Sequence, residues 1–141
     1  MIPRRILAGT DFSEASRHAL ERAADLARGV GAEVHLVHVL ALHDADPAVA
    51  SDSLMSAVPP EVEDVVVDRQ VVRALRPELG LLRAAREVEA DLIVLGTHGR
   101  TGLQHIILGS VASRVVQLAS CPVLTVRQPG HTFVHPEEVT P

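Results

Sequence analysis

The sequence predicts an α/β protein with a doubly wound, five-stranded parallel sheet and helices on both faces. Short runs of valine, isoleucine and leucine alternate along the 141-residue chain with segments of helical spacing. Each run is almost continuous in apolar residues, which is typical of parallel strands covered on both faces. Such sheets have right-handed crossovers and bind ligands beyond the carboxyl ends of the strands, where the strand order reverses. The loops after the first, second and fourth strands are therefore the expected location of a site.

Helices are expected where apolar residues recur every three or four positions. The first begins near Asp11 or Ser13, either of which can cap it, and Gly29 and Gly31 mark its end. The expected helices are 13–30, 77–88 and 110–119. The expected strands are 5–8, 34–40, 69–74, 91–95 and 123–126.

Two stretches lack a clear period. Residues 41–60 hold three prolines and three aspartates, which favours a loop with at most a short helix around 48–55. Residues 62–67, before the third strand, also fit a helix. Residues 129–141 contain three prolines and no periodicity, so the expected organisation is one domain over 1–128 and a tail over 129–141.

Composition excludes several classes of protein. The formal net charge is −5 and the only aromatic residues are Phe12 and Phe133, which argues against nucleic-acid binding. No apolar run reaches the roughly 18 residues of a membrane-spanning helix, and the apolar stretch near the N-terminus is too short for a signal peptide. A cytoplasmic protein without a membrane partner is therefore expected. The single cysteine, Cys121, rules out an internal disulfide.

Charge is unevenly distributed along this acidic chain. From Leu92 to Gln128 there is no aspartate or glutamate, although three arginines and two histidines lie there. Either this segment is a buried strand and helix that needs few charges, or it forms an anion site.

The loop after the fourth strand is rich in glycine. Four glycines lie between residues 96 and 109, and Gly109 and Ser110 open the next helix. Glycine permits a close approach to the backbone, and a helix start offers free amides and a positive dipole end to phosphate. A plain glycine-rich turn with Ser110 as a helix cap is the alternative. The loop lacks the lysine of a Walker A motif, and only one glycine follows the first strand, so this is no dinucleotide fingerprint either.

The spacing Gly96-x2-Gly99-x9-Gly109-Ser110 resembles the ATP-binding motif of the universal stress protein family. The resemblance covers most of the chain, because four further blocks typical of the family occur in the right order: 6–13, 36–39, 90–100 and 121–126. It implies a parallel sheet with strand order 3-2-1-4-5, which brings the first and fourth strands together at the reversal.

The resemblance also implies an ATP site, with magnesium as its expected companion. Val39 is expected against adenine, Asp11 near the ribose or a phosphate-bound metal, and His98 beside the ribose and phosphates. Asp11 has a rival role as a helix cap, and His98 as a loop-packing residue. The implied binding residues are Gly9, Thr10, Asp11, Val39, Leu95, Gly96, His98, Gly99, Gly109, Ser110, Val111 and Ala112.

One segment departs from the family. Residues 41–61 are short and broken by prolines where the family has a long second helix, which leaves one face of the sheet or one wall of the adenine pocket less covered.

His35, His38 and His43 suggest a metal site, but strand positions three apart point to opposite faces. No metal ligand is assigned to them.

Two functions are compatible with this motif. The favoured one is an ATP-binding stress-response module that acts through its nucleotide-dependent state or its partners, with little or no catalysis. The alternative is a slow ATPase or nucleotidyl-transferring enzyme. Binding is favoured because no lysine or carboxylate pair accompanies the motif, and because a chain of this length leaves little room for a second substrate.

A homodimer through the last strand is also expected. Residues 123–126 form an apolar strand that the family order places at a sheet edge, and such an edge invites pairing with another chain. The resemblance implies the same surface, since many family members dimerise there. The rival arrangement has the tail covering this edge, although its prolines make it a poor strand partner.

Overall fold

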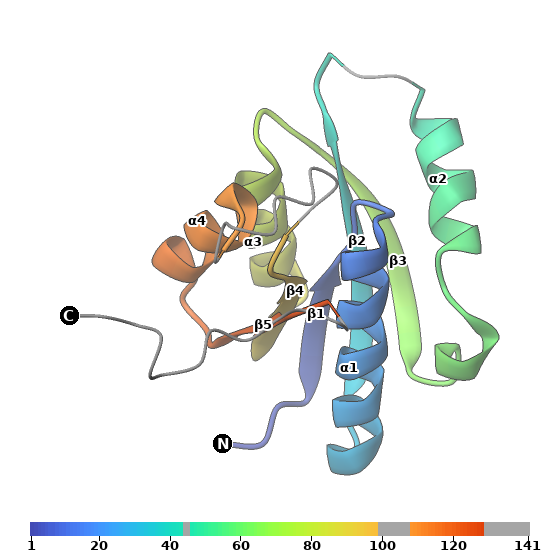
Figure 1. Ribbon diagram of the computed structural model, residues 1–141, viewed down its shortest axis with the longest axis vertical. Helices are drawn as coiled ribbons and strands as arrows, with labels where there is room; N and C mark the ends of the chain where they lie inside the picture. The colour runs from blue at the N-terminus through green and yellow to red at the C-terminus, as the bar shows by residue number, and fades with distance from the viewer. Residues whose placement is uncertain (44–45, 99–107, 129–141) are drawn as a thin grey trace, which may run out of the picture.

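The computed structural model describes residues 1–43, 46–98 and 108–128. Its centre is a five-stranded parallel sheet in the order β3-β2-β1-β4-β5, as predicted (Figure 1). The strands are β1 (Arg5–Gly9), β2 (Glu33–Ala41), β3 (Val66–Ala74), β4 (Leu92–Gly96) and β5 (Val123–Val126).

Helices cover both faces of the sheet, which confirms the predicted fold class. Helices α1 (Glu14–Val30) and α2 (Pro47–Ser56) lie on one face, and α3 (Pro77–Glu87) and α4 (Ser110–Leu118) lie on the other (Figure 1). Each face has its own apolar core. Ile6, Leu20 and Leu36 belong to the first core, and Leu7, Val37 and Ile93 belong to the second. No helix in 1–43, 46–98 or 108–128 has the length and apolar character needed to cross a bilayer.

Helix α1 follows its sequence signals closely. The side chain of Ser13 caps it by accepting a hydrogen bond from the amide of Ser16, and Gly31 ends it in the left-handed conformation, with φ of 75°. The helix lies against the sheet through a stripe of small residues. Its buried positions are Ala15, Ser16, Ala19, Leu20, Ala23, Ala24 and Ala27.

Between β2 and β3, where the sequence predicted a loop with at most a short helix around 48–55, the structure has the short helix α2. Asp46 caps α2, Pro47 occupies its first turn, and Leu54 is buried to 2% exposure in the first core. Residues 60–62 form a 3-10 turn, and β3 begins at Val66, three residues before the predicted start. Short as it is, α2 covers its part of the sheet face.

The reversal of strand order lies between β1 and β4. The chain leaves β1 toward α1 on one face and leaves β4 toward α4 on the other, although the two strands are neighbours. The two loops therefore diverge at the carboxyl edge of the sheet, which is where a crevice forms in this class of fold.

Candidate functional site

A cavity of about 440 Å³ opens at this carboxyl edge. Of the twelve residues that the sequence assigned to a ligand site, eleven line it, and Gly99 lies outside the described residues. Five lining residues were not predicted: Ser16, His38, Pro77, Leu81 and Thr97. The wall thus combines the ends of β1, β2 and β4 with the first turns of α1, α3 and α4.

The loop after β1 is held by hydroxyl groups. The amide of Phe12 donates to Thr10 Oγ1 at 3.0 Å, and that hydroxyl also lies 3.0 Å from Ser16 Oγ. Phe12 itself is left-handed, with φ of 65°, a conformation that needs support in a residue with a Cβ. Asp11 Oδ1 accepts from the amide of Ser13 at 3.0 Å, so Asp11 tightens the turn before the helix while also lining the cavity.

His38 connects β2 to the same loop. Its Nδ1 lies 2.8 Å from the carbonyl oxygen of Thr10, and its ring lies 4.3 Å from that of Phe12. His35, on the same strand, lies between the carboxylates of Glu33 and Asp68 instead. Within the described parts of the chain, no group of three metal-ligating side chains forms.

The glycines on the β4 side serve the protein's own packing. A Cβ on Gly109 would lie 2.9 Å from the carbonyl oxygen of Thr97, to which the Gly109 amide donates a hydrogen bond. A Cβ on Gly96 would lie 3.1 Å from the backbone carbonyl of Ala15. Glycine was expected here to let a ligand approach the backbone. The structure adds a second reason, because other backbone segments of the same chain pack closely against these two glycines.

The N-terminus of α4 gives the cavity an electropositive wall. Gly109 caps the helix without a side-chain hydrogen bond, and the first turn carries no acidic residue. The first amides of a helix have no intrahelical acceptor and form the positive end of its dipole. Ser110, Val111 and Ala112 all line the cavity, so this end is suited to an anion.

Another part of the lining is apolar. Val39 from β2, Pro77 and Leu81 from α3, and Leu95 from β4 line it. A cavity with an apolar wall and a helix start matches a ligand that has a flat apolar part and an anionic part.

The family model described as the universal stress protein family matches residues 3–127. The chain belongs to the universal stress protein family. Among members, a universal stress protein of Methanocaldococcus jannaschii, MJ0531, is 34% identical over 143 aligned positions, covering 89% of this chain and 83% of that protein. The universal stress protein YxiE of Bacillus subtilis is 30% identical, covering 87% of this chain and 98% of that protein.

Solved structures agree with this membership. That of the protein MJ0577 has a TM-score of 0.76 at 28% identity, covering 92% of this chain and 99% of that chain. A universal stress protein from Archaeoglobus fulgidus, solved in complex with dAMP, has a TM-score of 0.64 at 28% identity, covering 89% of this chain and 98% of that chain. An adenine nucleotide therefore binds at least one universal stress protein of similar fold.

Proposed function

We propose that this universal stress protein is an ATP-binding stress-response module that acts through its nucleotide-dependent state, with little or no catalysis. One observation carries the proposal: the cavity at the strand reversal joins an apolar wall to the start of α4, where no side chain accepts from the first amides. Adenine would lie against Val39 and Leu81, and the phosphates would accept hydrogen bonds from the amides of Ser110, Val111 and Ala112. The dAMP complex of the Archaeoglobus fulgidus relative supports the choice of an adenine nucleotide.

Magnesium fits this arrangement through Asp11. It is the one carboxylate among the described residues that line the cavity. Mg²⁺ is commonly held by one or two carboxylates together with substrate phosphates, so a single aspartate is sufficient. The chain has no lysine, so only helix amides, arginine and histidine could balance the phosphate charge. A bound magnesium ion would neutralise part of that charge.

The runner-up is a slow ATPase or nucleotidyl transferase. Asp11 and His98 line the same cavity, so a carboxylate and an imidazole are available to a bound nucleotide. Asp11 already accepts from the Ser13 amide, and Thr97 Oγ1 lies 3.0 Å from His98 Nδ1. Both groups therefore form hydrogen bonds within their own loops, which favours binding over catalysis.

A cytoplasmic location and a domain over 1–128 with a tail over 129–141 complete the proposal.

The test replaces Ser110 by glutamate. A carboxylate in the first turn suits the helix dipole, so α4 remains stable, yet it repels the phosphates. We expect Ser110→Glu to weaken ATP binding at least tenfold by calorimetry. Ser110→Gln, of the same size and without the charge, is the control and should bind within about threefold of the wild-type protein. Equal affinity in the wild-type protein and Ser110→Glu would locate the phosphates elsewhere.

A further inference from the structure

A second cavity, of about 870 Å³, lies between α1 and α2, which stand side by side on the same face of the sheet (Figure 1). It is called here the α1–α2 groove. Among the described residues, it shares Thr10 and Ser16 with the cavity of the candidate site and is otherwise a separate space. Its polar lining includes Glu14, Arg17 and Ser53. Its apolar lining consists of Phe12, Leu20, Ala57, Val58, Pro59 and Pro60.

Part of this apolar lining remains accessible. Phe12, Ala57 and Pro59 are half-buried and Pro60 is exposed, whereas Leu20 is buried. Proline has no backbone amide to donate, so the Pro59-Pro60 pair offers ring surface without a donor. Such a lining suits an apolar side chain, and above all an aromatic ring, because the ring of Phe12 can pair with it.

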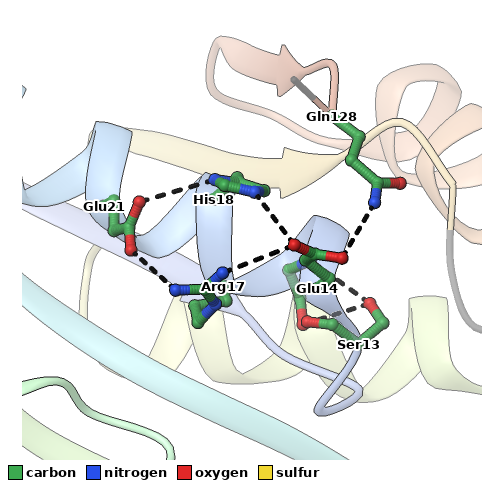
Figure 2. Close-up of polar contacts among 7 residues, drawn as sticks. Ser13, Glu14, Arg17, His18, Glu21 and Gln128 are labelled. Carbon is green, nitrogen blue, oxygen red and sulfur yellow. Dashed lines mark hydrogen bonds and ion pairs between the residues drawn. The ribbon is translucent and has the colours of Figure 1, made fainter. Parts of the chain in front are cut away.

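The last described residue of the chain, Gln128, lies beside this groove. Its side-chain Nε2 donates a hydrogen bond to Glu14 Oε2 at 3.3 Å (Figure 2). Arg17 and His18 lie 3.5 and 3.7 Å from the other oxygen of the same carboxylate, Oε1. Glu14 also lines the α1–α2 groove, so the residue that holds Gln128 belongs to the groove itself. The tail, residues 129–141, therefore starts next to the groove.

The tail is long enough to enter the groove. Pro129 and Gly130 follow Gln128 directly, and this pair is typical of a turn. Phe133 is the fifth residue after Gln128, and an extended segment of that length spans up to about 17 Å. A helix with its side chains is about 10–12 Å across, so Phe133 can cross the first turn of α1 and reach the groove.

We infer that the tail docks in the α1–α2 groove of its own chain, with Phe133 against Phe12 and the Pro59-Pro60 pair. A tethered segment has an effective concentration in the millimolar range, so it occupies the groove ahead of a free peptide of equal affinity. The edge of β5 is the rival location, but the prolines of the tail make it a poor strand partner. Docking in the groove leaves that edge open to a second copy of the chain. The inference is independent of nucleotide binding.

The experiment is fluorine NMR of the full chain labelled with 4-fluorophenylalanine. Phe12 and Phe133 are the only aromatic residues, so the spectrum has two signals, and Phe133→Leu assigns them. We expect the Phe133 signal to differ from its position in concentrated urea, where the groove no longer exists. Ser53→Arg fills the groove with a long charged side chain and should move the Phe133 signal to its urea position. Ser51→Arg, on the same helix but outside the groove lining, is the matched control and should leave the signal unchanged.

A Phe133 signal at the urea position in the wild-type chain would overturn the inference. So would a distinct signal that Ser53→Arg leaves unchanged, or one that both arginine variants move equally. A signal that Leu124→Glu moves and Ser53→Arg does not would locate the tail on the β5 edge instead. Circular dichroism verifies that each variant is folded. Phe133→Leu leaves the groove itself intact and should move the Phe12 signal, so an unmoved Phe12 signal overturns the inference even if Ser53→Arg fails to fold.

Discussion

Asp91 joins the start of β4 to the start of β1. Its Oδ2 accepts hydrogen bonds from the amides of Arg4 and Arg5, at 2.8 and 3.0 Å. These two backbone hydrogen bonds, helped by the nearby arginine charges, lower the pKa of the Asp91 carboxyl below its ordinary value of 3.8. The ionised form therefore stabilises the folded protein at neutral pH.

We expect Asp91→Asn to lower the free energy of unfolding at pH 7. Because the folded pKa is depressed, the contribution of Asp91 is fully present above about pH 4 and is lost as the pH falls through the folded pKa. The gap between wild type and variant should therefore narrow below pH 3.8. Urea denaturation at several pH values measures this. Asp52→Asn, on the exposed side of α2, is the control and should show no such gap, whereas a constant gap for Asp91→Asn would contradict the assignment.

The residues that line the cavity can be compared with those predicted from the sequence. Glycine spacing and the helix start are local signals for the phosphate side, and the family resemblance supplied the rest of the eleven residues that line the cavity. Pro77 and Leu81 were missed because they follow β3, and only the folded sheet brings the start of α3 to the end of β1. His38 was missed because its contact with the carbonyl of Thr10 spans 28 positions in sequence. Whether the eleven residues bind nucleotide stays a prediction.

At the scale of elements, α3 approaches β2 through a glycine. A Cβ on Gly80 would lie 2.6 and 2.8 Å from the two γ carbons of Val39 and 3.1 Å from Cβ of Ala74. Helix propensity alone favours alanine over glycine by about 1 kcal/mol. Here the collision outweighs that gain, because a branched valine held in a sheet has little freedom to move.

We expect Gly80→Ala to destabilise the protein by about 1–3 kcal/mol in urea denaturation. Adding Val39→Ala, which removes the colliding carbons, should make the Gly80→Ala change much less harmful in the double variant. Gly29→Ala near the end of α1 is the matched control, because nothing lies within 4 Å of its added Cβ, and it should be neutral or stabilising. A harmless Gly80→Ala would mean that the helix moves freely away from the sheet.

The two edge strands differ in what covers them. β5 ends one side of the sheet with Leu124 42% exposed, and β3 ends the other with Val67 56% exposed. Helix α2 packs against β3 and β2, whereas β5 is contacted by α1 and α4. We propose that the homodimer forms through residues 123–126 of β5, with each copy pairing antiparallel to the other.

Light scattering at micromolar concentration should therefore give the mass of a dimer. Leu124→Glu is expected to convert it to a monomer, because a charge would be buried in the interface. Val67→Glu, at the opposite edge, is the matched control and should leave the dimer intact. The reverse result would assign the interface to β3, and a monomeric wild-type protein would refute the dimer altogether.

Strands were predicted best where the apolar run in the sequence is unbroken. β1, β4 and β5 are such runs, and each begins and ends within one residue of its predicted bounds, although β5 lies at the sheet edge and has no buried residue. β3 was placed three residues late, because its exposed edge position allows Asp68, Arg69 and Gln70 to interrupt the apolar pattern. Residues 41–60 gave no firm period because α2 buries only Ala50 and Leu54.

For the molecule as a whole, the rate of ATP hydrolysis decides between a binding module and an enzyme. The described chain offers one carboxylate and no lysine around the cavity, and we expect ATP hydrolysis far below the roughly 10 per second of a typical enzyme. A steady-state assay measures this, with Ser110→Glu as the control for contaminating activity. A rate near 10 per second that disappears in Ser110→Glu would establish the enzyme reading instead.

The alanine stripe of α1 has a consequence for how this protein can change over generations. Ala19, Ala23 and Ala27 are fully buried against the sheet, and no smaller side chain except glycine exists. Almost every mutation on this stripe therefore adds volume where interiors are already close-packed. The exposed side of α1 carries no such restriction. The helix should accept drift on one side and almost none on the other, so its rate of acceptable substitution alternates with the period of the helix itself.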